Sequence, residues 1–276
     1  MPTIQANGVN LFYKESGRGP ETIVFSHGFL MDHTMFEPQR AAFEKDYRVI
    51  AYDHRAQGQS QDAGQGYDMD TQAYDAAALI TALNAAPCHF AGLSMGGFVG
   101  MRLGAHHPGL IRTLTLMNTT AAAEKRLNRI RYTVLAQLVK LVGIGPFAPI
   151  AVRDLFGRTT RNSAARRAML EEWTAKFRVR PKNVASTLME VANRREFTAE
   201  EIALVRCPTL IIAGEDDKAQ PPANSRSLAE GIRGARFVTI PGAGHSSSLE
   251  EPEAVIAAMR ELLQTAHKSS GSGTPI

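Results

Sequence analysis

The segment Gly92-Leu93-Ser94-Met95-Gly96 constrains the fold more than any other part of the sequence. An apolar run suited to a buried strand precedes it at residues 88–91, and residues 97–103 read as a tightly packed helix. G-x-S-x-G between a strand and a helix is the pattern of a sharp turn that presents a serine hydroxyl to open space. Side chains at the two glycine positions would collide with the neighbouring strand or helix. We therefore predict that Ser94 is a nucleophile, and the alternative is a glycine-rich helix start with an inactive serine.

A serine hydroxyl is a weak nucleophile until a base takes its proton, so the chain must also supply a histidine and a carboxylate. With this type of turn the expected chain order is Ser, then Asp or Glu, then His. Three carboxylates, Glu215, Asp216 and Asp217, follow a predicted strand that ends at Gly214. His245 lies in a glycine-rich loop after the last predicted strand, and we predict that it is the base.

Two backbone N–H groups are expected to hold the oxyanion that forms during acyl transfer. One belongs to Met95, directly after the nucleophile, and the other to Phe29, which follows the strand predicted at residues 22–26. His27 has a rival interpretation as the base, but its place early in the chain favours a structural, hydrogen-bonding role.

The polar loop at residues 53–60 offers a further carboxylate, Asp53. Asp53 is either a catalytic acid or a structural residue that fixes this loop through Arg55. We favour the structural role.

The alternation of apolar runs and helical patterns predicts an α/β fold with a mostly parallel sheet. Asn7-Gly8 predicts the turn of an N-terminal hairpin over residues 4–13. Further strands are expected at residues 22–26, 48–52, 88–91, 111–117, 207–214 and 235–240, and helices at residues 33–43, 69–83, 95–106, 225–232 and 254–263.

Residues 121–196 interrupt this alternation, because helical patterns alone occur there, at residues 124–141, 150–156, 162–177 and 182–193. This segment holds 16 Lys and Arg against 6 Asp and Glu, whereas the whole chain has a net charge of only +4. This excess of basic residues either belongs to an ordinary solvated surface or indicates a preference for anionic substrates. No nucleic-acid-binding motif accompanies it, so we expect no nucleic-acid partner.

Trp173 and Phe177 stand four residues apart and can share one helical face. That face either packs inside the insertion or lines a substrate pocket. We assign both residues to substrate binding, together with Phe29 and Leu30 near the expected oxyanion site.

The remaining features suggest an intracellular protein. We find no signal-peptide pattern and no apolar run of roughly 18 residues that would span a membrane. Neither cysteine has metal-ligand spacing, and we expect no metal and a cytoplasmic location. Residues 1–120 and 197–266 are expected to form the core, and residues 267–276 a disordered tail.

The chain resembles the α/β-hydrolase superfamily. The resemblance rests on His27-Gly28-Phe29, the loop at residues 53–60, the segment at residues 92–97, the acidic loop after Gly214 and the loop that holds His245. It is similar to the bacterial group of 3-oxoadipate enol-lactonases, carboxylesterases and cofactor-free haloperoxidases. The family spacing selects Asp217 as the acid, and the resemblance implies that residues 121–196 form a cap. Ala56 departs from the glycine that is common in the loop.

This resemblance implies a serine hydrolase that cleaves a small carboxylic ester or lactone through an acyl-enzyme, without a cofactor. Perhydrolase or haloperoxidase activity and the cleavage of carbon–carbon bonds are alternatives that use the same three residues. A ligand receptor with slight turnover is an alternative from another class. The acyl group, the alcohol and the oligomeric state are left open.

Overall fold

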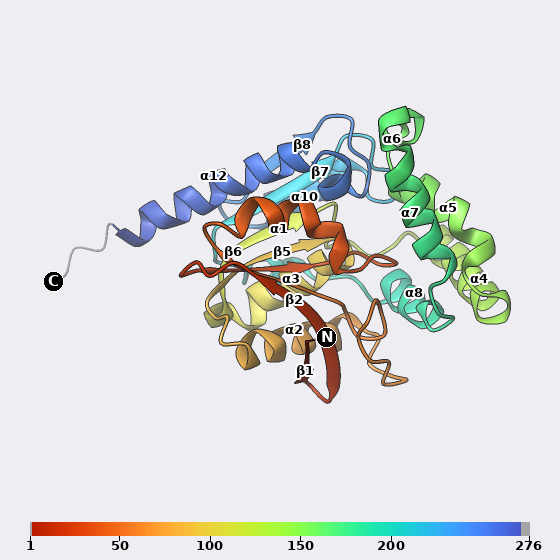
Figure 1. Cartoon of the computed structure of the whole chain (residues 1–276), viewed down its shortest axis with the longest axis horizontal. Coiled ribbons are helices and arrows are strands. Elements are labelled where there is room, and N and C mark those ends of the chain that lie inside the picture. The colour runs from red at the N-terminus through yellow and green to blue at the C-terminus, as the bar shows by residue number, and fades with distance from the viewer. Residues whose placement is uncertain (1, 272–276) are drawn as a thin grey trace.

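The fold is built on one eight-stranded sheet, seen near the centre of Figure 1. A computed structural model describes residues 2–271, with side chains described as far as residue 266. The strands are β1 (Thr3–Ala6), β2 (Val9–Ser16), β3 (Thr22–Ser26), β4 (Arg48–Tyr52), β5 (Cys88–Leu93), β6 (Ile111–Met117), β7 (Thr209–Gly214) and β8 (Arg236–Ile240). Their order across the sheet is β1-β2-β4-β3-β5-β6-β7-β8.

The pairing confirms the predicted, mostly parallel sheet. β1 and β2 form the expected antiparallel hairpin, and β2 also pairs antiparallel with β4, whereas all pairs from β4 to β8 are parallel. The hairpin turn places Asn7 and Gly8 at positive φ, which these two residue types tolerate best. Every residue of β3, β5 and β7 is buried, as expected for central strands that are covered on both faces.

Helices cover both faces of the sheet and bury two separate apolar cores. Helices α1 (Glu37–Phe43) and α12 (Pro252–Gly271) pack on one face, through residues such as Phe43 and Met259. Helices α2 (Met69–Ala82), α3 (Met95–His106) and α10 (Pro222–Gly231) pack on the other, through residues such as Phe98 and Leu228. The shorter elements are η1 (His33–Phe36), η2 (Pro108–Leu110), α9 (Ala199–Ile202) and α11 (Ser247–Glu250).

Several predicted boundaries differ from the structure by a few residues, and the helix expected over residues 162–177 is divided into α6, η4 and α7. The helix expected over residues 33–43 begins as the 3₁₀ turn η1, which ends before Pro38 enters the first turn of α1. The tail expected to be disordered from residue 267 instead continues the backbone of α12 to Gly271, since no proline or glycine interrupts the sequence between Pro252 and that glycine. Residues 272–276 lie outside the described residues.

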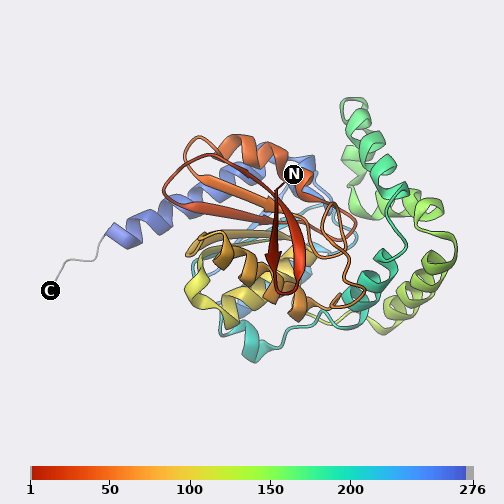
Figure 2. The same cartoon turned by 60° about the horizontal axis from the view of Figure 1, so that its bottom comes forward.

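Residues 121–196, the helical insertion, lie between β6 and β7 and form a separate layer, at the right of Figures 1 and 2. Its elements are α4 (Arg126–Val142), η3 (Gly145–Phe147), α5 (Ala148–Leu155), α6 (Arg158–Asn162), η4 (Ala164–Arg166), α7 (Arg167–Arg178) and α8 (Val184–Asn193). The backbone N–H of Phe197 donates to the carbonyl of Ala121 at 2.9 Å, so the insertion leaves and rejoins the core at one point.

Candidate active site

Ser94 lies in a strained turn between β5 and α3. Its φ of 53° and ψ of −108° are unusual for a residue with a side chain. A Cβ atom at Gly92 would lie 2.1 Å from the carbonyl oxygen of Gly96, and a Cβ at Gly96 would lie 2.1 Å from that of Ser26. Both positions therefore require glycine, which is the physical reason for the G-x-S-x-G pattern.

His245 and Asp217 are hydrogen-bonded to each other across the loops after β8 and β7. Nδ1 of His245 lies 2.8 Å from Oδ2 and 3.1 Å from Oδ1 of Asp217, and both side chains are buried. The backbone N–H of Gln220 also donates to Asp217 Oδ1 at 2.8 Å. Of the three candidate carboxylates, Asp217 is therefore the one that contacts the imidazole.

Asn118 is a further residue of this cluster that the sequence analysis missed. Its Nδ2 donates to Oδ2 of Asp217 at 2.9 Å and to the carbonyl of Gly244 at 3.0 Å, so it joins the acid to the loop of the histidine. Asn118 has a positive φ of 51° directly after β6. An asparagine that ends a core strand is the signal that could have pointed to it, since asparagine tolerates this conformation.

Glu250 also supports His245 and was likewise missed. Its carboxylate accepts hydrogen bonds from the backbone N–H groups of Gly244 and Ser246, on either side of the histidine, and from Gly157 of the helical insertion. Burial raises the pKa of Glu250, although these bonds and one from Thr160 oppose the shift. The loop of the histidine is therefore anchored to the insertion.

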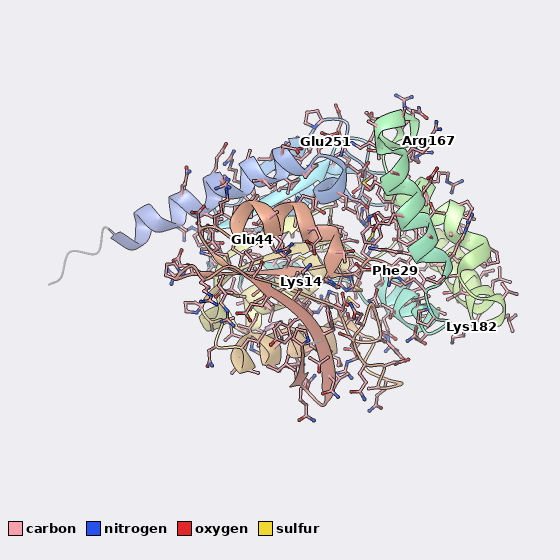
Figure 3. All side chains as sticks on the ribbon, in the orientation of Figure 1. Lys14, Phe29, Glu44, Arg167, Lys182 and Glu251 are labelled. Carbon is pink, nitrogen blue, oxygen red and sulfur yellow. The ribbon has the colours of Figure 1, made fainter. Side chains whose placement is uncertain are left out.

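The two expected oxyanion donors flank Ser94. A Cβ atom at Gly28 would lie 3.6 Å from Cβ of Ser94, so the loop that carries Phe29 passes directly beside the serine. Met95 is the first residue of α3, where a backbone N–H has no acceptor within its own helix. Phe29 lies where the core faces the helical insertion (Figure 3).

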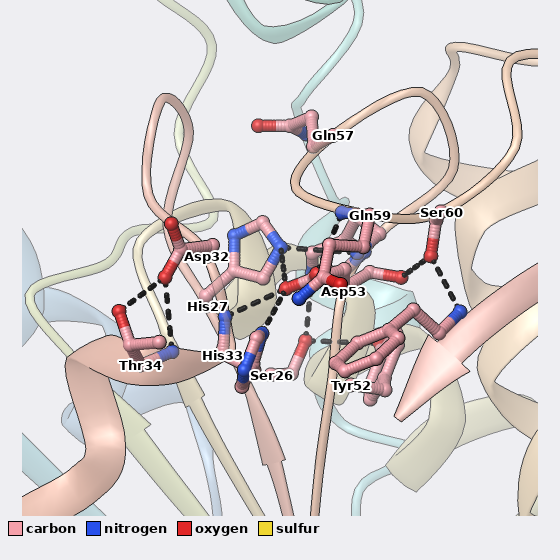
Figure 4. A network of polar contacts seen from close by, with 12 residues as sticks. Ser26, His27, Asp32, His33, Thr34, Tyr52, Asp53, Gln57, Gln59 and Ser60 are labelled. Atoms are coloured by element: carbon pink, nitrogen blue, oxygen red, sulfur yellow. Dashed lines mark hydrogen bonds and ion pairs between the residues drawn. The ribbon is translucent and has the colours of Figure 1, made fainter. Parts of the chain in front are cut away.

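His27 and Asp53 lie in a buried polar network beneath this loop (Figure 4). Nε2 of His27 accepts the backbone N–H of His54 at 3.0 Å, so we assign the ring proton to Nδ1, which lies 2.8 Å from the carbonyl of Gly28. Burial lowers the pKa of His27, against the charge of Asp53. Both ring nitrogens of His27 are therefore engaged by backbone groups, which agrees with the structural role that the sequence favours.

Asp53 is a structural residue too, but its partner was predicted wrongly. Oδ1 accepts hydrogen bonds from the backbone and side chain of His33, and Oδ2 accepts the N–H of Gln59. Arg55 instead pairs with Asp75 of α2 at 2.6 Å. Asp75 lies on α2, which packs beside the loop of Arg55. The residues next to Arg55 in the sequence do not indicate which helix lies there.

One cavity, between the core and the helical insertion, brings four of the predicted site residues together. Ser94, His245, Phe29 and Leu30 line it. Most of its other lining residues are apolar side chains of the insertion and of α3: Phe98, Tyr132, Leu135, Ile144, Phe147, Ile150, Ala151, Leu155, Leu188, Val191 and Ala192.

Trp173 and Phe177 are not among the residues that line this cavity, which corrects their assignment to substrate binding. Both side chains are buried in α7, with ring centroids 6.0 Å apart. The ammonium of Lys176 lies 4.3 Å from the centre of the Trp173 ring. They share one helical face, as predicted, and that face is buried and does not line the cavity.

A polar clasp joins the insertion to the loop of Phe29. Arg180, just after α7, donates to the carbonyl of Leu30 at 2.9 Å and to the carboxylate of Asp32 at 2.8 Å. Burial favours the neutral form of Asp32, but hydrogen bonds from Thr34 and the charge of Arg180 hold its pKa well below the ordinary value.

Two kinds of feature are absent from the described part of the chain. No group of three or more His, Cys, Asp or Glu side chains within it is arranged to hold a metal ion. None of its helices is both long and apolar enough to cross a membrane.

The strained serine turn, the His–Asp pair and the mostly parallel sheet define a class of protein. A family profile described as alpha/beta hydrolase fold matches residues 21–252. The chain therefore belongs to the alpha/beta hydrolase fold family, and the resemblance seen in the sequence is confirmed.

Two solved structures and one curated protein are similar to this chain over most of its length. A thermophilic esterase from Thermogutta terrifontis superposes with a TM-score of 0.89 at 27% identity, over 97% of this chain and 100% of the esterase. The enol-lactonase from Burkholderia xenovorans LB400 gives a TM-score of 0.87 at 29% identity, over 95% of this chain and 100% of that enzyme. The 3-oxoadipate enol-lactonase 1 of Acinetobacter baylyi is 30% identical, over 86% of this chain and 88% of its own length.

Proposed function

We propose that this protein is a serine hydrolase that cleaves carboxylic esters or lactones. One observation carries the proposal: Ser94 and His245 line the same cavity, and His245 is hydrogen-bonded to the buried Asp217. The similarity to an esterase and to enol-lactonases supports this class of substrate.

In the first half of the reaction, Oγ of Ser94 attacks the carbonyl carbon while His245 takes its proton. Asp217 holds the imidazole in the tautomer with its proton on Nδ1 and stabilises the imidazolium that forms. The N–H groups of Phe29 and Met95 stabilise the oxyanion of the tetrahedral intermediate. His245 then protonates the departing alkoxide, which leaves an ester between the acyl group and Ser94.

In the second half, water attacks the acyl-enzyme and His245 takes its proton. Collapse of the second tetrahedral intermediate returns the proton to Ser94 and releases the carboxylic acid. For a lactone the alcohol and the acid stay in one molecule. The helical insertion acts as a cap that excludes water and shapes the acyl or alcohol pocket, because its side chains form much of the cavity wall. We place the enzyme in the cytoplasm.

The test combines covalent labelling with kinetics. A fluorophosphonate probe should form one adduct, located at Ser94 by mass spectrometry, and 4-nitrophenyl acyl esters should be turned over many times. We expect Ser94→Ala to lower kcat by about a million-fold, with an unchanged melting temperature.

Ser227→Ala is the matched control, because Ser227 is exposed on α10. It should keep both the label and the activity. Labelling at another serine would overturn the assignment, and a single slow turnover with retained product would favour a receptor.

A further inference from the structure

The cavity that holds Ser94 contains one buried ion pair, within a wall that is otherwise mostly apolar. Nη1 of Arg195 lies 2.9 Å from the carboxylate of Glu124, and each side chain is only 7% exposed. Both residues belong to the helical insertion and both line the cavity. An ion pair at the wall of a substrate cavity decides which charges the cavity accepts, since an unpaired buried charge is costly.

The guanidinium of Arg195 is already occupied by the protein. Its Nε donates to the carbonyl of Ala122 at 3.3 Å. Its two terminal nitrogens face the side-chain amide of Gln220, whose oxygen, when turned toward them, accepts at 2.9 and 3.3 Å. Together with Glu124, these partners engage four of the five N–H donors, so one N–H of Nη2 is all that the guanidinium offers to a substrate carboxylate.

The cavity wall also offers no unpaired cation to an anionic substrate. Among the described lining residues, the charged ones are Arg195, Glu124 and Asp154, and Asp154 is itself paired with Arg153 at 3.0 Å. The insertion as a whole is strongly basic, but Arg195 alone among its 16 Lys and Arg residues reaches the cavity. The interpretation that this basic charge selects anionic substrates is therefore not supported.

We infer that the enzyme selects uncharged, apolar esters or lactones and that Glu124 is the residue that enforces this choice, by neutralising Arg195 at the cavity wall. This inference rests on the proposed hydrolase function and adds its substrate class. A substrate carboxylate would have to leave water for an apolar cavity in which the single cation is already paired.

The test compares two esters that differ mainly in charge, 4-nitrophenyl butyrate and the mono-4-nitrophenyl ester of glutaric acid. In the wild type, we expect kcat/KM to favour the butyrate by about a hundredfold. Glu124→Gln leaves Arg195 with an uncompensated charge, so the ratio should shift toward the glutarate ester by about tenfold or more, the size of one charge-assisted hydrogen bond.

Two further variants control the experiment. Glu171→Gln makes the same change of charge at an exposed position of α7 and should leave the ratio unchanged. The double variant Glu124→Gln/Arg195→Met should lose the gain, because the gain acts through the guanidinium.

The outcomes separate this inference from the proposed function. A wild type that cleaves the glutarate ester as well as the butyrate would overturn the inference, and so would a folded Glu124→Gln with an unchanged ratio. If Glu124→Gln does not fold, the wild-type ratio alone decides. If neither ester is cleaved and no fluorophosphonate adduct forms, the proposed function itself has failed.

Discussion

At the scale of single residues, the loop after β7 shows why one of three adjacent carboxylates differs from its neighbours. Asp217 is buried and contacts His245, Asn118 and the backbone of Gln220. Asp216 contributes its backbone N–H to the carbonyl of Ala243 and thereby ties this loop to that of His245. Asp217 therefore acts through its side chain, whereas Asp216 acts through its main chain.

Replacing each aspartate by asparagine should separate these roles. Asp217→Asn should lower kcat by about 10⁴-fold, because an amide at this position favours the wrong tautomer of His245. Asp216→Asn keeps the backbone bond and should have a much smaller effect. The measurement is kcat on a 4-nitrophenyl ester, with circular dichroism to verify folding. A larger loss in Asp216→Asn would mean that the acid has been misassigned.

At the scale of elements, central strands were the easiest features to predict. The expected ranges 22–26, 48–52 and 111–117 coincide with β3, β4 and β6. β3 and β4 appear in the sequence as apolar runs that begin at a polar residue, and β6 appears as an alternation of Leu and Thr after Pro108-Gly109, so the limits of these strands are clear. The strained turn at Ser94 was equally clear, because its glycines are a steric necessity.

The helices of the insertion were harder to interpret. Helices α4, α5 and α8 contribute apolar residues to the cavity wall, whereas α7 contributes none, and helical spacing alone does not distinguish these two cases. Trp173 was misassigned for this reason. Asn118 was missed because its partner Asp217 lies far away in the sequence, and the bond of Glu250 to Gly157 was missed for the same reason.

The position of Trp173 predicts a loss of stability without a change of specificity. We expect Trp173→Ala to lower the free energy of unfolding by about 3–5 kcal/mol, as is usual when a buried aromatic ring is removed. The relative kcat/KM values for small and bulky esters should stay the same, since the ring does not line the cavity.

Val179→Ala is the control for this variant, because Val179 is 80% exposed just after α7. It should leave the urea unfolding midpoint unchanged. A change of ester preference in Trp173→Ala, with unaltered stability, would return Trp173 to the substrate pocket.

At the scale of the whole molecule, buried neutral histidines link folding to pH. Burial lowers the pKa of His27, and it lowers that of His54 well below the ordinary value. In the unfolded chain both have a pKa of about 6.5. Between the folded values and about 6.5 the unfolded chain binds more protons, so the free energy of unfolding falls as the pH falls through this window.

We therefore expect the free energy of unfolding, measured by urea denaturation, to fall between about pH 7 and about pH 5, by at most about 1.4 kcal/mol per pH unit for each histidine, and the urea midpoint to fall with it. His27→Asn should make this decline shallower. Val179→Ala, at an exposed position without a titratable side chain, should not change it. A midpoint that is constant over this range in the wild type would contradict the assignment of neutral buried rings.

The clasp formed by Arg180 has a consequence for how such enzymes diversify. The guanidinium of Arg180 bonds both to Asp32 and to the carbonyl of Leu30. Leu30 directly follows Phe29, whose N–H is an expected oxyanion donor. The insertion is therefore not an independent module that evolution or an engineer can exchange freely. A graft from a relative would have to carry a counterpart of Arg180 that meets Asp32, or the new specificity would come with a poorly held oxyanion site.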